Sequence, residues 1–142
     1  MSIIGTIHNN GSGRHVALKD GSVVQDNHVI SSSTKETAHP WELVEYDAKE
    51  LGKLWSLRVP GSNLFIGIQG EASQLPNHLD LRLARFLWKT EPRDISNHKG
   101  PIIFSTLNGE FSWTEGDDRG SIVVKPTDAS SEAQKWVFNS PH

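Results

Sequence analysis

The chain contains no cysteine, so neither disulfides nor thiol chemistry contribute to it. No apolar run approaches the roughly 18 residues that a membrane-spanning helix needs, and the N-terminal segment 1–6 lacks the basic start and apolar stretch of a signal peptide. A formal net charge of −3 without a basic stripe argues against a nucleic-acid partner. We therefore expect a cytoplasmic protein without membrane insertion, stabilised by hydrophobic packing.

Motifs for catalysis are also missing. The sequence has no His-Glu-x-x-His, no Gly-x-Ser-x-Gly and no phosphate-binding glycine loop. Its 7 histidines are widely spaced, which is not the pattern of a metal site. We predict no enzyme activity, no catalytic residue, no metal site and no cofactor.

An internal repeat is present instead. Trp41, Trp88 and Trp136 lie 47 and 48 residues apart, and each belongs to a short segment with apolar neighbours. This spacing is close to one third of the 142 residues. A fixed period of this length indicates one supersecondary unit repeated three times.

Each unit contains the same succession of strand signals. A second apolar strand lies about 23 to 25 residues before each tryptophan, and a Gly or Asn turn with another strand precedes it. A third strand fills the remaining gap. The second strands are expected at 15–18, 64–68 and 110–113, and the third strands at 28–30, 79–83 and 122–124. Four strands in each of three units make twelve.

This pattern predicts an all-β fold, a β-trefoil with twelve strands in three pseudo-threefold repeats. A β-sandwich would also use short strands, but it does not require threefold repetition. We expect a single domain over residues 1–142, with repeats at about 1–50, 51–97 and 98–142. Segments 47–53 and 95–100 would connect the units, and the three tryptophan rings would pack in the core.

The segments that end in tryptophan resemble the repeat of ricin-B-type lectins, whose last strand carries Gln-x-Trp. Unit three has this motif as Gln134-Lys135-Trp136, whereas units one and two have His39-Pro40-Trp41 and Phe86-Leu87-Trp88. From about Ala38 onward the chain is similar to the small mushroom β-trefoil lectins that recognise fucosylated N-glycan cores. The short join from Leu79 to Trp88 is part of this likeness.

The lectin resemblance implies a glycan partner, a fungal defence role and a site on unit two. A homodimer is left open, since avidity would strengthen a weak site. One departure is that the additional stacking tryptophan of those lectins corresponds to Ile68 here. Carried over by position, the glycan surface consists of Leu81, Arg85, Phe86, Leu87 and Trp88.

The first third of the chain is similar to a second group, the cysteine-free mushroom β-trefoil protease inhibitors of the mycospin and mycocypin type. Lys19-Asp20-Gly21-Ser22 occupies a loop that presents a basic residue to trypsin in such inhibitors. The partner would then be a serine or cysteine protease. The short join before Trp88 and the Gln134-Lys135-Trp136 motif favour the lectin. The protease-contact residues in the alternative are Lys19, Gly21, Asn63, Lys125 and Lys135.

Overall fold

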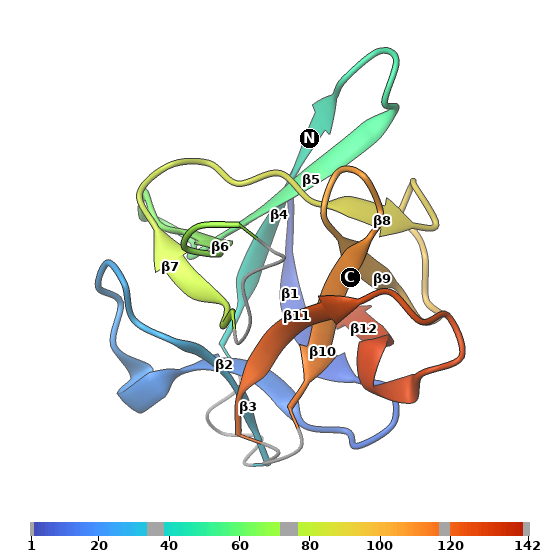
Figure 1. Ribbon diagram of the computed structural model, residues 1–142. Coiled ribbons are helices and arrows are strands. Elements are labelled where there is room, and N and C mark those ends of the chain that lie inside the picture. Colours follow the sequence, from blue (N-terminus) through green and yellow to red (C-terminus); the bar gives the residue numbers. More distant parts are fainter. Residues whose placement is uncertain (1, 34–38, 72–76, 117–119, 141–142) are drawn as a thin grey trace.

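The computed structural model describes residues 2–33, 39–71, 77–116 and 120–140, and Figure 1 shows them as short strands joined by turns. No helix within these ranges is long and apolar enough to cross a membrane. The strands are β1 (Ser2–Asn9), β2 (His15–Leu18), β3 (Val29–Ser32), β4 (Trp41–Asp47), β5 (Lys53–Arg58), β6 (Phe65–Gly67), β7 (Asp80–Arg82), β8 (Lys89–Glu91), β9 (Ile103–Ser105), β10 (Phe111–Glu115), β11 (Ile122–Pro126) and β12 (Trp136–Asn139). The 3-10 turns η1 (Lys19–Gly21) and η3 (Glu132–Gln134) accompany them.

Six of these strands follow one another around a closed barrel. β1 pairs with β12 and β4, β4 with β5, and β8 with β9, all antiparallel. Trp55 of β5 exchanges backbone hydrogen bonds of 3.0 and 2.7 Å with Trp88, which directly precedes β8. Ile102, directly before β9, does the same with Trp136 of β12 at 2.7 and 2.9 Å. These two exchanges close the ring, so the barrel has no open edge at those strands.

The other six strands form three hairpins, one in each unit: β2–β3, β6–β7 and β10–β11. Their third strands meet each other, because Val29 N donates to Leu79 O at 2.9 Å and Leu79 N donates to Ile122 O at 3.0 Å. The hairpins therefore support one another across the units as well as the barrel strands beside them.

The three repeat tryptophans make the same hydrogen bond. The indole Nε1 groups of Trp41, Trp88 and Trp136 donate to backbone carbonyls of β2, β6 and β10 at 3.2, 3.0 and 3.1 Å. All three rings are fully buried, as expected for core packing. The repeat inferred from their spacing is confirmed. The three acceptor residues are Val16, Ile66 and Trp113.

Aromatic side chains fill the centre of the core. The Trp113 ring lies 5.5 Å from that of Trp88 and 6.1 Å from that of Trp136, both edge to face, and Phe104 stacks on it at 4.4 Å. Edge-to-face and offset stacks are the favoured geometries of aromatic pairs. The core is therefore shared by units two and three rather than divided between them.

Segment 47–53 was expected to connect units one and two. Residues 48–52 form the turn of the long β4–β5 hairpin, which projects at the top of Figure 1. Lys49 and Gly52 have φ of 48° and 78° in this turn, the left-handed region in which glycine is favoured. The predicted third strand of unit two, 79–83, is shorter in the structure, because the chain bends after Arg82. The join to Trp88 begins at this bend.

Candidate functional site

Arg85 is held over an aromatic ring from another unit. It is exposed on the join between β7 and β8, and its guanidinium carbon lies 4.8 Å from the centroid of the Tyr46 ring. Tyr46 is near the end of β4 and 40% exposed. This cation–π contact orients the guanidinium at the surface and leaves its N–H groups available to a ligand.

Phe86 lies flat against the hairpin β6–β7 because a glycine faces it. A Cβ atom on Gly67 would lie 3.0 Å from the Phe86 ring and 2.9 Å from Arg82. On its other side the Phe86 ring is 4.7 Å from the ring of Trp88. Phe86 is therefore half-buried and fixed in position, with one part of its ring in contact with the core.

Two hollows of about 410 Å³ each lie on either side of Arg85. The first is mainly apolar, and the second contains an ion pair between Glu42 and Arg58. The first is lined by Arg85, Phe86, Leu87, Thr106 and Leu107. The second is lined by Ser2, Glu42, Val44, Ser56, Arg58, Phe65 and Arg85. Arg85 thus separates an apolar surface from a polar one.

Glu42 supplies a negative charge in the second hollow. Arg58 Nε donates to Glu42 Oε1 at 2.9 Å. Although burial raises the pKa of Glu42, hydrogen bonds from Arg58 and Ser2 outweigh it and hold that pKa below its usual value. The carboxylate is therefore ionised at neutral pH and offers acceptors beside the Arg58 and Arg85 donors.

The architecture agrees with solved structures. The sequence matches no protein-family model and no curated protein. The chain is similar to the ricin B-like lectin of Macrolepiota procera, solved in complex with lactose, with a TM-score of 0.70 and 16% identity over 97% of this chain and 95% of that one. The Rhizoctonia solani agglutinin gives a TM-score of 0.76 and 14% identity over 99% and 96%. ThreeFoil, a designed threefold-symmetric protein, gives 0.66 and 14% over 95% and 96%.

The chain is a β-trefoil. Its neighbours include a mushroom ricin B-like lectin, as the sequence resemblance suggested. At identities of 14 to 16% the likeness establishes the fold and leaves the function to the residues of the site.

The β-trefoil distributes the five predicted glycan-site residues between core and surface. The side chains of Leu81 and Trp88 are fully buried, so they support the surface and offer no side-chain contact to a ligand. Arg85 is exposed, and Phe86 and Leu87 are half-buried on the first hollow. Ile68, at the position of the family's stacking tryptophan, is 6% exposed and offers no stacking surface.

Tyr46 and Leu107 belong to this surface although the sequence analysis did not select them. Tyr46 alternates with the buried Trp41 and Leu43 along β4, so strand alternation alone indicates that it points outward. Leu107, in the turn between β9 and β10, carries no comparable signal, because its neighbours across the hollow come from another unit.

The five predicted protease-contact residues lie in four separate places in the fold. Lys19 and Gly21 are exposed in η1, and Asn63 is exposed in the turn between β5 and β6. Lys125 is half-buried on β11, and the Lys135 ammonium lies 3.0 Å from the carboxylate of Glu132. Of these residues, the structure brings only Lys19 and Gly21 into one connection.

The loop that follows Lys19 has an ordered internal arrangement. The side-chain amide of Asn27 donates to the carbonyls of Lys19 and Ser22 at 3.0 and 2.7 Å. Val23 and Val24, between these anchors, are 43% and 53% exposed. The backbone of this loop is therefore held by hydrogen bonds from Asn27, and two apolar side chains are exposed on it. Lys19 lies where the loop begins.

Proposed function

We propose that this β-trefoil is a non-catalytic lectin that binds glycans at the surface around Arg85. The observation that carries the proposal is the position of Arg85, held on Tyr46 between an apolar and a polar hollow. Small-ligand sites typically combine apolar walls with a few fixed polar groups. Both parts are present here within reach of one side chain.

The chemistry of the surface suits a sugar ring. The apolar C–H face of a sugar can pack on the exposed part of Phe86 and on Leu87 and Leu107. Its hydroxyls can accept from the Arg85 guanidinium and donate to the ionised Glu42 carboxylate. The surface is shallow, so we expect weak binding to single glycans, and avidity from several copies would strengthen it.

Removal of the Arg85 side chain tests the proposal. A glycan array on the parent identifies a ligand, and titration with that ligand compares the parent with Arg85→Ala. We expect at least about a fivefold loss of affinity, since a hydrogen bond to a charged group contributes about 1.5–3 kcal/mol. Circular dichroism should show an unchanged fold, because Arg85 is exposed.

Arg93→Ala is the matched control, since it removes the same exposed side chain at a position outside both hollows. It should bind as the parent does. If Arg85→Ala also binds as the parent does, the site assignment is wrong. If the array finds no glycan at all, the lectin proposal itself fails.

Protease inhibition is the second candidate, and the braced loop between β2 and β3 favours it. An inhibitor needs an exposed loop that enters a protease cleft without losing much conformational freedom. Val23 and Val24 form the exposed part of this loop, so a protease with an apolar specificity pocket suits it better than trypsin does.

A panel of trypsin-like, elastase-like, cysteine and asparagine-specific proteases separates this candidate from the lectin. Stoichiometric inhibition that Asn27→Ala weakens would support the loop. Lys19→Ala and Asn63→Ala test the two residues predicted from the sequence. Full activity of all four protease types with micromolar protein would remove the inhibitor candidate.

A further inference from the structure

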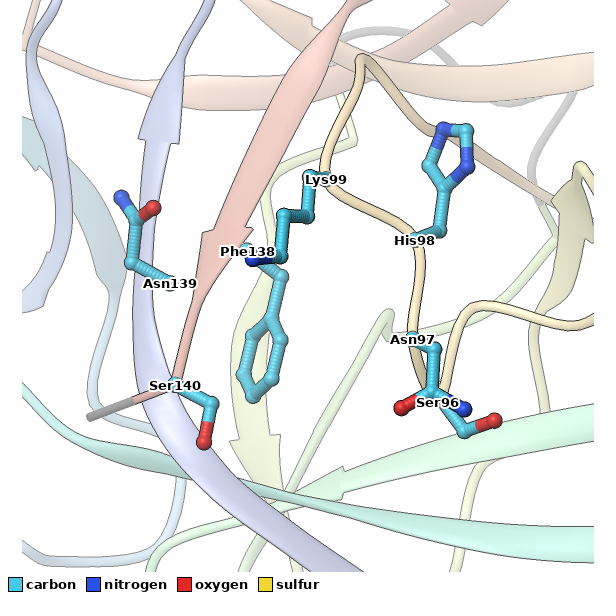
Figure 2. A pocket seen from close by; sticks show the side chains of 7 residues that line it. All are labelled: Ser96, Asn97, His98, Lys99, Phe138, Asn139 and Ser140. Carbon is cyan, nitrogen blue, oxygen red and sulfur yellow. The ribbon is translucent and has the colours of Figure 1, made fainter. Parts of the chain in front are cut away.

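A third hollow, of about 400 Å³, lies away from the Arg85 surface and shares no lining residue with it. It is formed where the connection between β8 and β9 passes the end of β12 (Figure 2). Its lining residues are Ser96, Asn97, His98, Lys99, Phe138, Asn139 and Ser140. Six of the seven are polar, and none is acidic.

The charge of this hollow is opposite to that of the molecule. The chain carries a net charge of −3, yet the charged side chain in the lining is the cation Lys99. Among the described residues, no carboxylate forms an ion pair with Lys99. The nearest acidic residue in the sequence, Asp94, is instead paired with Lys53 at 3.0 Å. Lys99 is therefore available to an anionic group.

The side chain of Asn139 lies on the same face of the β1–β12 pair as His8. Its amide nitrogen donates to Nδ1 of His8 at 3.0 Å. Burial and the nearby His15 lower the pKa of His8, so the imidazole is neutral at physiological pH and can accept this bond. Figure 2 shows the side chain of Asn139 on the opposite side of the β1 and β12 strands from Phe138 and Lys99. The Asn139 amide therefore does not point into the hollow.

The other polar groups of the lining are partly held as well. His98 Nε2 donates to the carbonyl of Pro101 at 3.2 Å, which fixes the imidazole and leaves Nδ1 unused by that bond. The Ser96 hydroxyl donates to Asp94 at 2.7 Å and retains its acceptor capacity. These side chains are preorganised before any ligand arrives, which lowers the entropic cost of binding.

Phe138 forms the floor of the hollow, and its position is fixed by a glycine on β1. A Cβ atom on Gly5 would lie 2.3 Å from the carbonyl oxygen of Asn139 and 2.7 Å from Cζ of Phe138. The absence of a side chain at Gly5 therefore lets β12 pack closely against β1. As a result, Phe138 lies between Ser140 and the segment 96–99 in Figure 2.

We propose that this hollow binds an acidic sugar, a pyranose ring that carries a carboxylate. The carboxylate would pair with the Lys99 ammonium, and ring hydroxyls would bind Asn97 and Ser140. The volume of the hollow falls in the range of small-ligand sites.

Glucuronic acid and glucose are the probes, because they differ only in the carboxylate at C6. Each is titrated into ¹⁵N-labelled parent protein and followed by amide chemical shifts. Glucuronic acid should shift residues 96–99 and 138–140 and bind at least about tenfold more tightly than glucose, as expected for one charged hydrogen bond. Lys99→Gln should lose this discrimination, and Lys49→Gln, which removes a distant exposed lysine, should keep it.

Equal binding of glucose and glucuronic acid, or unchanged discrimination in Lys99→Gln, would overturn the proposal. Acetate, a carboxylate without a sugar ring, is a further probe. If acetate at the same concentration produces the same shifts, the hollow recognises an anion without the sugar, and the assignment is wrong. The proposal is independent of the lectin proposal, because shifts at 85–87 and 106–107 report that surface and shifts at 96–99 report this one.

Discussion

Two substitutions relative to unit three create the aromatic surface of unit two. In unit three the Gln134 side chain donates to the Thr114 hydroxyl at 3.0 Å and to the carbonyl of Pro126 at 2.9 Å. Thr114 directly follows the indole acceptor Trp113, as Gly67 follows Ile66. Phe86 occupies the position of Gln134, two residues before the repeat tryptophan. Where unit three has a hydrogen bond between Gln134 and Thr114, unit two therefore has the Phe86 ring packed against Gly67.

The double variant Gly67→Thr with Phe86→Gln introduces into unit two the residue pair that forms the Gln134–Thr114 hydrogen bond in unit three. We expect a folded protein within about 1 kcal/mol of the parent, because the new hydrogen bonds offset the lost contact of the Phe86 ring with Trp88. Glycan binding should fall at least several-fold, since the apolar stacking surface is removed. Chemical denaturation measures the stability and glycan titration the affinity. Parent-like affinity would exclude Phe86 from the site.

The carboxylate of Asp94 links the connection between β8 and β9 to strand β5. Asp94 accepts from Ser96 Oγ at 2.7 Å, from Ser96 N at 3.1 Å and from Lys53 Nζ at 3.0 Å. The bonds from Ser96 and then that from Lys53 lower the pKa of Asp94 from 3.8 to about 2. The same connection carries residues 96–99 of the third hollow.

Asp94→Asn should change how the stability of the protein depends on pH in the acidic range. The folded pKa is below the unfolded value, so the carboxylate stabilises the fold above pH 3.8, and this contribution is lost as the pH falls toward about 2. The melting temperature of the parent should therefore decrease more between pH 4 and about 2 than that of Asp94→Asn. Parallel curves for the two proteins over this interval would contradict the assigned role of Asp94.

The whole molecule is organised around the three equivalent indole hydrogen bonds. They link the last strand of each unit to the second strand of the same unit, at 3.2, 3.0 and 3.1 Å. The exchanges of backbone bonds between Trp55 and Trp88 and between Ile102 and Trp136 then join the units into the barrel. The repeat tryptophans therefore connect strands within a unit and also lie where the barrel closes.

Trp41→Phe, Trp88→Phe and Trp136→Phe should destabilise the protein by similar amounts. Each removes one buried hydrogen bond and leaves a small cavity, which costs about 1–3 kcal/mol. The three values should agree within about 1 kcal/mol, because each indole makes an equivalent hydrogen bond. Urea unfolding of the three variants provides the measurement. A single variant that is far less stable than the other two would show that the threefold equivalence is structural but not energetic.

Much of the fold could be predicted from the sequence because its signals are local or strictly periodic. The spacing of Trp41, Trp88 and Trp136 indicated three units, and the apolar runs between turns indicated the strands. Of the candidate site, Arg85, Phe86 and Leu87 were selected by resemblance and lie at the surface, whereas Leu81 and Trp88 are buried. The loop position of Lys19 was predicted from the sequence, whereas the exposure of Val23 and Val24 in the same loop was not.

The sequence by itself determined the number of units, the strand order within them and the burial of the repeat tryptophans, since a period and its apolar positions are properties of the chain alone. Only the tertiary structure decided which hollows exist. Arg85 meets Tyr46 across 39 residues of sequence, and Lys99 faces Phe138 only because β12 packs on Gly5. Such contacts depend on closure of the barrel, which brings together segments whose local patterns carry no information about one another.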